Sequence, residues 1–216
     1  MKIINASAHI DRGGRTFEEM RRGILQRIER AARTCYKSED AICEGSDEVL
    51  TRNLVKREHF AMLEHATVSV RFVVDIGVAR EITRHRVASF AQESTRYCNY
   101  SGQRFGSQIT VIRPCFLPDE ESPEYRTWLL ACTTAELAYF RMLELTGRSE
   151  QARDVLPIST KTELYMTANM REWKHFFDLR ADGTTGAPHP QMLEVAVPLK
   201  KEFQKLCPEI FDEPET

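Results

Sequence analysis

The sequence lacks the features that mark membrane-spanning, secreted and low-complexity proteins. No run of 18 apolar residues occurs, and the first residues, MKIINASAHIDRGG, contain neither the basic segment nor the apolar segment of a secretion signal. Only 10 glycines and 9 prolines occur among 216 residues, whereas 42% of the residues are hydrophobic. This composition excludes collagen-like and disordered chains. We therefore expect a globular protein of the cytoplasm without a membrane partner.

Patterns for disulfides and metal sites are also missing. The chain has six cysteines but no CxxC pair, and its six histidines do not cluster with them at the short spacing typical of zinc sites. Without a secretion signal, disulfides are not expected. The sequence therefore predicts no metal and reduced thiols at Cys35, Cys43, Cys98, Cys115, Cys132 and Cys207.

The common nucleotide-binding and hydrolase motifs do not occur either. There is no GxxxxGK[ST] loop, no GxGxxG after a strand and no GxSxG. Lys and Arg number 30 and Asp and Glu number 32, which gives a net charge of −2. The protein therefore has no overall basic field for nucleic acid, and any recognition of a phosphate group must be local.

The spacing of apolar residues predicts more helix than strand. Strand patterns cover residues 1–7, 66–74 and 107–114, and in the second of these every other residue from Ala66 to Val74 is apolar. Helix patterns cover about five turns after Thr16, residues 47–58, a stretch from Asp75 into RHRVASFAQESTRY, 123–147, 150–155, one or two helices over 164–179, and 191–206 with a kink at Pro198. Capping residues mark two of these helices: Thr16 with Glu19 before the first, and Ser122 and Gly147 at the ends of 123–147. Because helices and strands do not alternate regularly, and no repeat or linker occurs, we expect a single α+β domain spanning residues 1–216.

A dense group of arginines lies in the middle of the chain. Four of them fall between Arg80 and Arg96, next to the hydroxyl groups of Ser94 and Thr95. Guanidinium groups match phosphate oxygens in pairs, and hydroxyl and amide groups of a turn complete an anion site. The alternative is that these arginines solvate one helix face and pair with nearby glutamates. Apolar residues interrupt the charges and favour the partly buried anion site.

The same segment resembles a known family. Arg84-His85-Arg86, seven further residues and Ser94 match the RHR(x)7S motif of the flavin-dependent thymidylate synthases, the ThyX family. The similarity extends in the same order over most of the chain, at Ala32–Tyr36, Glu58-His59, Glu64-His65, Arg153 with Val155-Leu156-Pro157, Asn169-Met170-Arg171 and Leu179–Asp182.

This resemblance implies a reaction and an architecture. Members of the family convert dUMP to dTMP, with methylenetetrahydrofolate as carbon donor, FAD as hydride carrier and NADPH as reductant. The family is α+β with a small, mainly antiparallel sheet and forms homotetramers whose active sites are shared between subunits. The protein's own task is then to bind, orient and polarise the reactants.

The resemblance also implies roles for individual residues, with Arg180 as the catalytic residue that polarises the uracil. Contacts with dUMP are expected from Glu81, Arg84, Gln92, Glu93, Ser94, Thr95, Arg96, Arg153 and Arg180. Contacts with FAD are expected from His59, Arg84, His85, Arg86, Gln92, Asn169, Arg171 and His175.

Several of these residues have simpler interpretations. Arg153 can pair with Glu150 or Asp154 on a helix, and His175 stands among aromatic residues typical of a core. The chain also departs from the family, which usually has Gln three residues before RHR and Glu six residues after it. Here those positions hold Glu81 and Gln92, so the amide and the acid are exchanged.

Two other classes of protein use similar residues. A single-stranded RNA-binding module could combine the arginines with Phe90, Tyr97 and Tyr100 as stacking platforms, although the net charge argues against it. A simple flavin reductase would need the flavin contacts but neither Arg153 nor Arg180. A flavin absorbance band, and a dUMP effect on flavin turnover with NADPH, would separate the three.

Overall fold

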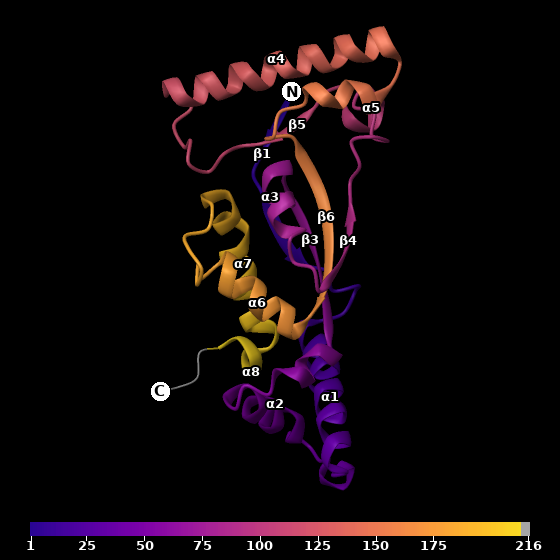
Figure 1. Cartoon of the computed structure of the whole chain (residues 1–216), viewed down its shortest axis with the longest axis vertical. Helices are drawn as coiled ribbons and strands as arrows, with labels where there is room; N and C mark the ends of the chain where they lie inside the picture. Colours follow the sequence, from indigo (N-terminus) through magenta and orange to yellow (C-terminus); the bar gives the residue numbers. More distant parts are fainter. Residues whose placement is uncertain (213–216) are drawn as a thin grey trace. The chain divides into compact units, whose positions relative to one another are not determined.

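Two nine-residue strands, β3 (Thr67–Asp75) and β6 (Lys161–Asn169), are the longest of the protein. A computed structural model describes residues 1–212 (Figure 1). Ala66 O accepts from Met170 N, the Ser69 and Thr167 hydroxyls lie 2.7 Å apart, and Thr160 O accepts from Ile76 N. The partner number falls as the residue number rises, so β3 and β6 run antiparallel.

The strands form two small sheets. The larger has the order β2-β3-β6-β4, with β2 at Ser7–Ile10 and β4 at Ala88–Gln92. In the smaller sheet, β1 (Lys2–Ile4) pairs in parallel with β5 (Thr110–Ile112). The predicted strands 1–7, 66–74 and 107–114 are confirmed, although the first and the last are shorter than expected.

Helices make up much of the remaining chain, which confirms the α+β prediction. None of them within residues 1–212 is long and apolar enough to cross a membrane. The α-helices are α1 (Phe17–Tyr36), α2 (Ser46–Lys56), α3 (Ile76–Ile82), α4 (Pro123–Thr146), α5 (Ser149–Ala152), α6 (Met170–Arg180), α7 (Pro190–Leu206) and α8 (Pro208–Phe211). The 3-10 helices are η1 (Glu39–Ala41), η2 (Phe60–His65), η3 (Gln103–Phe105) and η4 (Arg153–Val155).

The helix ends follow the local signals in the sequence. Thr16 and Glu19 form a reciprocal capping box at the start of α1: Thr16 Oγ1 accepts from Glu19 N at 3.1 Å, and Glu19 Oε2 accepts from Thr16 N at 2.8 Å. Ser122 caps α4, and Gly147 ends that helix with φ 66°, in the left-handed region. These ends confirm the predicted bounds of both helices.

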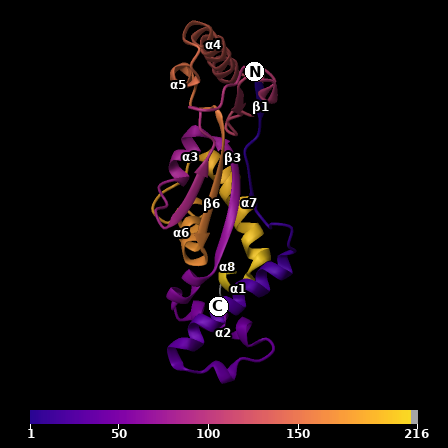
Figure 2. The ribbon, with the colours of Figure 1, turned by 90° about the vertical axis from the view of Figure 1, so that its right-hand side faces the viewer.

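The chain folds into two compact units, each with its own core. The first unit comprises Met1–Ser7, Phe72–Arg84 and Phe90–Tyr165; the second comprises Ala8–Arg71, His85–Ser89 and the chain from Met166 onward. The first unit buries a cluster of Tyr100, Ile109, Val111, Cys132, Tyr139 and Ala152. In the second unit, α1 contacts α2 and α2 contacts α8 (Figure 2), and α6, α7 and α8 share an aromatic core of Trp173, Phe176, Phe177, Phe203 and Phe211.

The predicted helix through the RHR segment is wrong. α3 ends at Ile82, the residues from Thr83 to Val87 are irregular, and β4 follows. None of the five residues of β4 is buried, so the segment gave no clear alternation of apolar and polar residues. It is a strand because β6 offers it an edge to pair with, and that pairing partner lies about 70 residues away in the sequence.

The predicted helix over 164–179 is only half right. α6 begins at Met170, whereas residues before it belong to β6. Leu164, Met166 and Ala168 are good helix formers, but they are buried in strict alternation with half-exposed or exposed neighbours. The period of burial therefore overrides their helix propensity.

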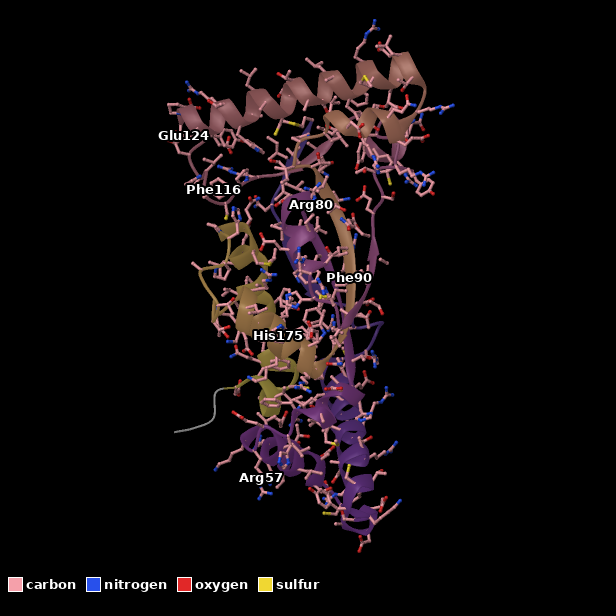
Figure 3. The ribbon with its side chains drawn as sticks, viewed as in Figure 1. Arg57, Arg80, Phe90, Phe116, Glu124 and His175 are labelled. Atoms are coloured by element: carbon pink, nitrogen blue, oxygen red, sulfur yellow. The ribbon has the colours of Figure 1, made fainter. Side chains whose placement is uncertain are left out.

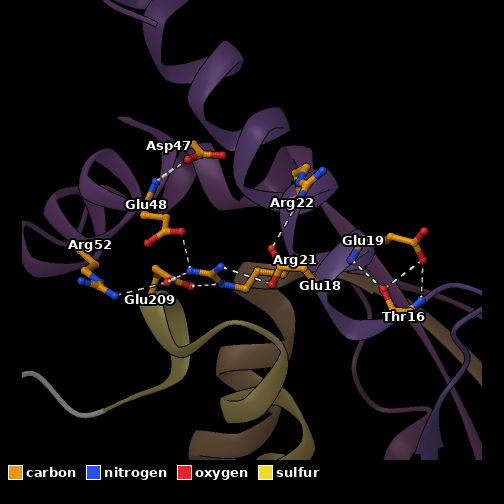
Figure 4. Close-up of polar contacts among 9 residues, drawn as sticks. All are labelled: Thr16, Glu18, Glu19, Arg21, Arg22, Asp47, Glu48, Arg52 and Glu209. Carbon is orange, nitrogen blue, oxygen red and sulfur yellow. Dashed lines mark hydrogen bonds and ion pairs between the residues drawn. The ribbon is translucent and has the colours of Figure 1, made fainter. Parts of the chain in front are cut away.

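A buried acid joins three helices of the second unit (Figure 4). The side chain of Glu209 on α8 is 0% exposed, and its Oε1 accepts from Arg21 Nη2 on α1 at 2.5 Å. Arg52 on α2 lies 3.4 Å from the same oxygen, and Arg21 also pairs with Glu48. Burial by itself would raise the pKa of Glu209, but the Arg21 hydrogen bond and charge lower it below its ordinary value.

Replacing Arg21 should therefore destabilise the protein strongly. Arg21→Met leaves the Glu209 carboxylate buried beside only the exposed Arg52, and we expect the free energy of unfolding to fall by about 2–4 kcal/mol at pH 7. Arg22→Met is the matched control, because Arg22 is 66% exposed and its ion pair with Glu18 is long, at 3.9 Å; its effect should stay within about 0.5 kcal/mol. Urea unfolding measures both.

The same pair predicts a direction for the pH dependence. Because the folded-state pKa of Glu209 is lowered, its stabilising effect is full above the unfolded pKa of about 4.3 and is lost as the pH falls through the folded value. The stability difference between wild type and Arg21→Met should therefore shrink in acid. A difference that stays constant down to the acid transition would contradict this account.

Candidate active site

Helix α6 and its N-cap carry three of the eight predicted flavin residues, and the end of β6 sets where the helix begins. Asn169 is the last residue of β6, and its Oδ1 accepts from Glu172 N at 2.8 Å, which caps α6. Arg171 and His175 follow at a spacing of four, so they lie on one side of the helix. Figure 3 shows His175 on α6. A local cap therefore places three predicted site residues relative to one another.

His85 joins this helix from the segment before β4. The ring is only 3% exposed. Its Nδ1 lies 2.9 Å from Glu172 Oε1, and Arg180 Nε donates to its Nε2 at 3.3 Å. The ring also packs 5.0 Å from Phe176 and 5.7 Å from His175, between ring centres. The structure thus brings together His85, His175 and Arg180, which are up to 95 residues apart in the sequence.

The surroundings favour a neutral His85. Burial lowers the pKa of His85, and Arg180 and His175 lower it further, whereas the Glu172 carboxylate raises it; the net direction is downward. In a neutral imidazole one nitrogen donates and the other accepts. Because Arg180 donates to Nε2, the proton belongs on Nδ1, where it faces Glu172.

The same cluster has the composition of a metal site. Single donor atoms of His85, Glu172 and His175 lie within 4.8 Å of one another. A metal on His85 Nδ1, however, would leave a proton on Nε2, opposite the Arg180 N–H, and a metal on Nε2 would displace Arg180. We therefore interpret the cluster as a hydrogen-bond chain from Glu172 through His85 to Arg180.

A cavity of about 360 Å³ is lined by Arg171 and by one further predicted flavin residue, His59. Its lining comes from α1, α2, η2, α6 and the segment between α2 and η2, and comprises Ala32, Cys35, Tyr36, Leu54, Glu58, His59, Phe60, Ala61, Met62 and Arg171. Arg171 Nη1 is 2.6 Å from Glu64 Oε1. Glu58 adopts a left-handed backbone with φ 57°, which is uncommon for a residue with a side chain. The walls offer aromatic surface, an imidazole and a guanidinium, groups that suit an aromatic anionic cofactor.

The predicted phosphate residues lie in the first unit, on the turn after β4. Ser94 O accepts from Tyr97 N and Cys98 N, and Ser94 Oγ accepts from Arg96 N at 3.3 Å. The Arg96 carbonyl accepts from Ser149 Oγ at 2.8 Å, which ties this turn to the start of α5. Arg153 follows four residues later on η4, and both Arg96 and Arg153 are exposed. Two exposed arginines and a hydroxyl-bearing turn are thus held on linked elements.

Three predicted dUMP contacts have other partners or surroundings. Glu93 Oε2 lies 2.7 Å from Lys161 Nζ, and Gln92 Nε2 donates to Thr162 Oγ1 at 3.3 Å, so both side chains bond to β6. Glu81 lies next to the last residue of α3, because the helix predicted to continue into the RHR segment ends at Ile82. Arg84 N donates to Glu81 O in a turn instead. Arg84 and Arg86 are exposed on the irregular segment after α3.

Sequence reasoning missed Glu172. A glutamate three residues after an Asn N-cap is an ordinary pattern for a helix start, so nothing local distinguishes it. Only the position of His85 against it, 87 residues away in the chain, shows that its carboxylate bonds to an imidazole.

Comparisons with known proteins agree with the sequence prediction. A family model described as "Thymidylate synthase complementing protein" matches residues 18–209. The "Flavin-dependent thymidylate synthase" of Kosmotoga olearia is 30% identical over 177 residues, which is 77% of this chain and 75% of that protein. The "Probable flavin-dependent thymidylate synthase" of Paramecium bursaria Chlorella virus 1 is 26% identical and covers 97% of this chain and 95% of its own.

A solved structure has a similar fold over nearly the whole chain. It is a UMP/dUMP methylase, PolB from Streptomyces cacaoi, bound with 5-Br dUMP. The TM-score is 0.74 at 26% identity, and the match covers 98% of this chain and 96% of that one.

The cap at Asn169 can be tested apart from its predicted cofactor contact. Asn169→Ala removes the acceptor for Glu172 N and should lower the free energy of unfolding by about 1 kcal/mol, whereas Asn169→Asp keeps an acceptor and should cost little. Urea unfolding measures the cap, and flavin titration of the same variants measures the contact. Equal destabilisation by Ala and Asp would show that the acceptor oxygen is unimportant.

Proposed function

The chain belongs to the family of thymidylate synthase complementing proteins, and from this premise we propose that it methylates dUMP to dTMP. In this proposal methylenetetrahydrofolate supplies the carbon, FAD carries the hydride and NADPH is the reductant. The observation that carries the proposal is the gathering of distant motif residues in the second unit. His85 meets Arg180 and His175, and His59 shares a cavity with Arg171.

The groups that line the cavity beside α6 support part of a site for FAD. Tyr36 and Phe60 offer apolar surface, and Arg171 offers a cation for a phosphate or a ring oxygen. Reduced flavin supplies the hydride when it is bound. We assign the holding of FAD to His59, Arg84, His85, Arg86, Gln92, Asn169, Arg171 and His175.

The turn after β4 supports a phosphate site for dUMP. Ser94 and Thr95 supply hydroxyl and amide donors, and Arg96 and Arg153 supply cations. Each exposed arginine contributes only a modest binding free energy toward a phosphate group in water. Two arginines beside a preformed turn therefore bind the phosphate more tightly than either arginine alone. We also assign Glu81, Arg84, Gln92 and Glu93 to the dUMP site, with Glu93 held there by Lys161.

Arg180 is the group we assign to the uracil. Its guanidinium is half-buried at the end of α6 and is held by His85. A fixed cation beside the pyrimidine favours negative charge on the ring, and a partly buried cation does so more strongly than an exposed one. Arg180 therefore polarises the substrate while the flavin side of the site orients the hydride donor.

We further propose a homotetramer in the cytoplasm. Helix α4 carries leucines that are more than 60% exposed, at Leu130, Leu137 and Leu145, on a surface that a second copy of the chain could cover. Because the chain has no dinucleotide-binding motif, a neighbouring subunit would complete the FAD site, as in the shared active sites of the family. The six cysteines are thiols, as is usual in a reducing compartment.

The central experiment is a reconstituted reaction. The purified protein, supplied with FAD, NADPH, methylenetetrahydrofolate and dUMP, should show a flavin band and form dTMP. UMP is assayed in parallel, because the solved relative is named a UMP/dUMP methylase. A protein that binds no flavin and forms no methylated nucleotide would refute the proposal, flavin without a dUMP effect would favour the reductase, and tight single-stranded RNA binding without flavin would favour the RNA module.

Arg180→Ala should reduce the rate of methylation far more than the affinity for FAD. Loss of a charge that interacts with a developing anion is expected to lower kcat by about 10²–10³-fold. Arg180→Lys should restore only part of the rate, because an ammonium group lacks the planar fork of guanidinium. A flavin affinity that falls as much as kcat would show that Arg180 serves the cofactor instead.

A further inference from the structure

We propose that Glu172 is a positioning residue, whose carboxylate holds the proton of His85 on Nδ1 so that Nε2 accepts from Arg180 and fixes its guanidinium. This inference rests on the proposed function only in what it assigns to Arg180. The hydrogen-bond chain itself is independent of the substrate.

Geometry places Glu172 rigidly. Its backbone N–H is held by the Asn169 cap at 2.8 Å, and its side chain is largely buried. One turn further along α6, Phe176 packs against the His85 ring. The ring is therefore bounded by an acceptor at Nδ1, a donor at Nε2 and an aromatic side chain beside it.

The chemistry of the groups allows one arrangement of protons. Guanidinium has donors and no acceptor, so Nε2 must be unprotonated to meet Arg180. A ring protonated on both nitrogens would present an N–H to Arg180, and so would the neutral ring with its proton on Nε2. A carboxylate at Nδ1 keeps the proton there, and the bond on one ring nitrogen sets the state of the other.

If Glu172 served only to cap α6, its carboxylate would accept from the backbone N–H of the N-cap residue. Glu19 occupies the same N3 position on α1, and there the carboxylate accepts from the backbone N–H of its N-cap, Thr16. On α6, the Glu172 carboxylate contacts His85 instead. The comparison within one chain shows that the N3 position does not itself dictate the contact with an imidazole.

The test uses Glu172→Leu and Glu172→Gln in the full-length holoenzyme. Leu removes the acceptor at Nδ1, so the His85 proton should move from Nδ1, and kcat for dTMP formation should fall about 10–100-fold, as for other partners that orient a histidine. Gln still offers an oxygen acceptor and should keep the Nδ1–H form and more of the activity. Nitrogen-15 NMR of labelled histidine reads the proton position, and flavin oxidation without dUMP checks that the bound flavin is intact.

A second histidine–glutamate pair provides the matched control. Glu202 on α7 lies 3.0 Å from His9 Nδ1, outside the candidate site. Glu202→Leu removes a carboxylate from an imidazole in the same way and should leave kcat at the wild-type value. A loss of kcat as large as that of Glu172→Leu would overturn the inference.

A double-mutant cycle tests whether Glu172 acts through Arg180. In an Arg180→Ala background, Glu172→Leu should cause no further loss of kcat, because the group that it positions is gone; losses that multiply would overturn the inference. If the Leu variant does not fold, the same double-mutant cycle is measured with Glu172→Gln. An Nδ1 proton that stays in place in Glu172→Leu would also overturn the inference, whereas a wild-type protein that makes no dTMP would refute only the proposed function.

Discussion

The junction between β6 and α6 is the constraint on which the candidate site depends. One side chain, Asn169, ends the strand and caps the helix, and this fixes the rotation of α6 about its own axis. Arg171 then faces the cavity that it lines with His59, and Glu172 faces His85. Because an α-helix has about 3.6 residues per turn, a shift of one residue at this junction would turn both side chains away from these partners. A capping hydrogen bond of ordinary strength therefore determines which groups each side chain of α6 faces.

In the interior of the second unit, the buried glutamates have partners that compensate for the loss of water. Glu29 pairs with Arg33, Glu172 with His85 and Glu209 with Arg21. An unpaired carboxylate there would cost several kcal/mol. The same low polarity strengthens the interaction of each pair. Burial thus raises the free energy needed to break the hydrogen bonds of the Glu172–His85–Arg180 chain, and this keeps the three side chains in one geometry.

The arginines of the proposed site fall into two physical classes. Arg96 and Arg153 are exposed, on elements tied together by Ser149, and such groups recognise a phosphate that keeps part of its hydration. Arg180 is half-buried and has a fixed partner. A held, partly desolvated cation stabilises charge that develops during a reaction, whereas mobile surface cations mainly increase affinity. The proposed division between phosphate binding and uracil polarisation follows from this difference in burial.

The sequence by itself determined the features that depend on neighbouring residues. The capping box at Thr16, the Ser122 and Gly147 ends of α4, the alternating burial of β3 and the α+β class were all predicted from local patterns, and the RHR(x)7S spacing indicated the family. Only the tertiary structure decided that residues 88–92 form a strand, that β6 rather than a helix precedes Asn169, and that Glu172 bonds His85. Each of these depends on a partner about 70 to 100 residues away, and the free energy of such pairing comes from burial and hydrogen bonds that no local sequence window contains.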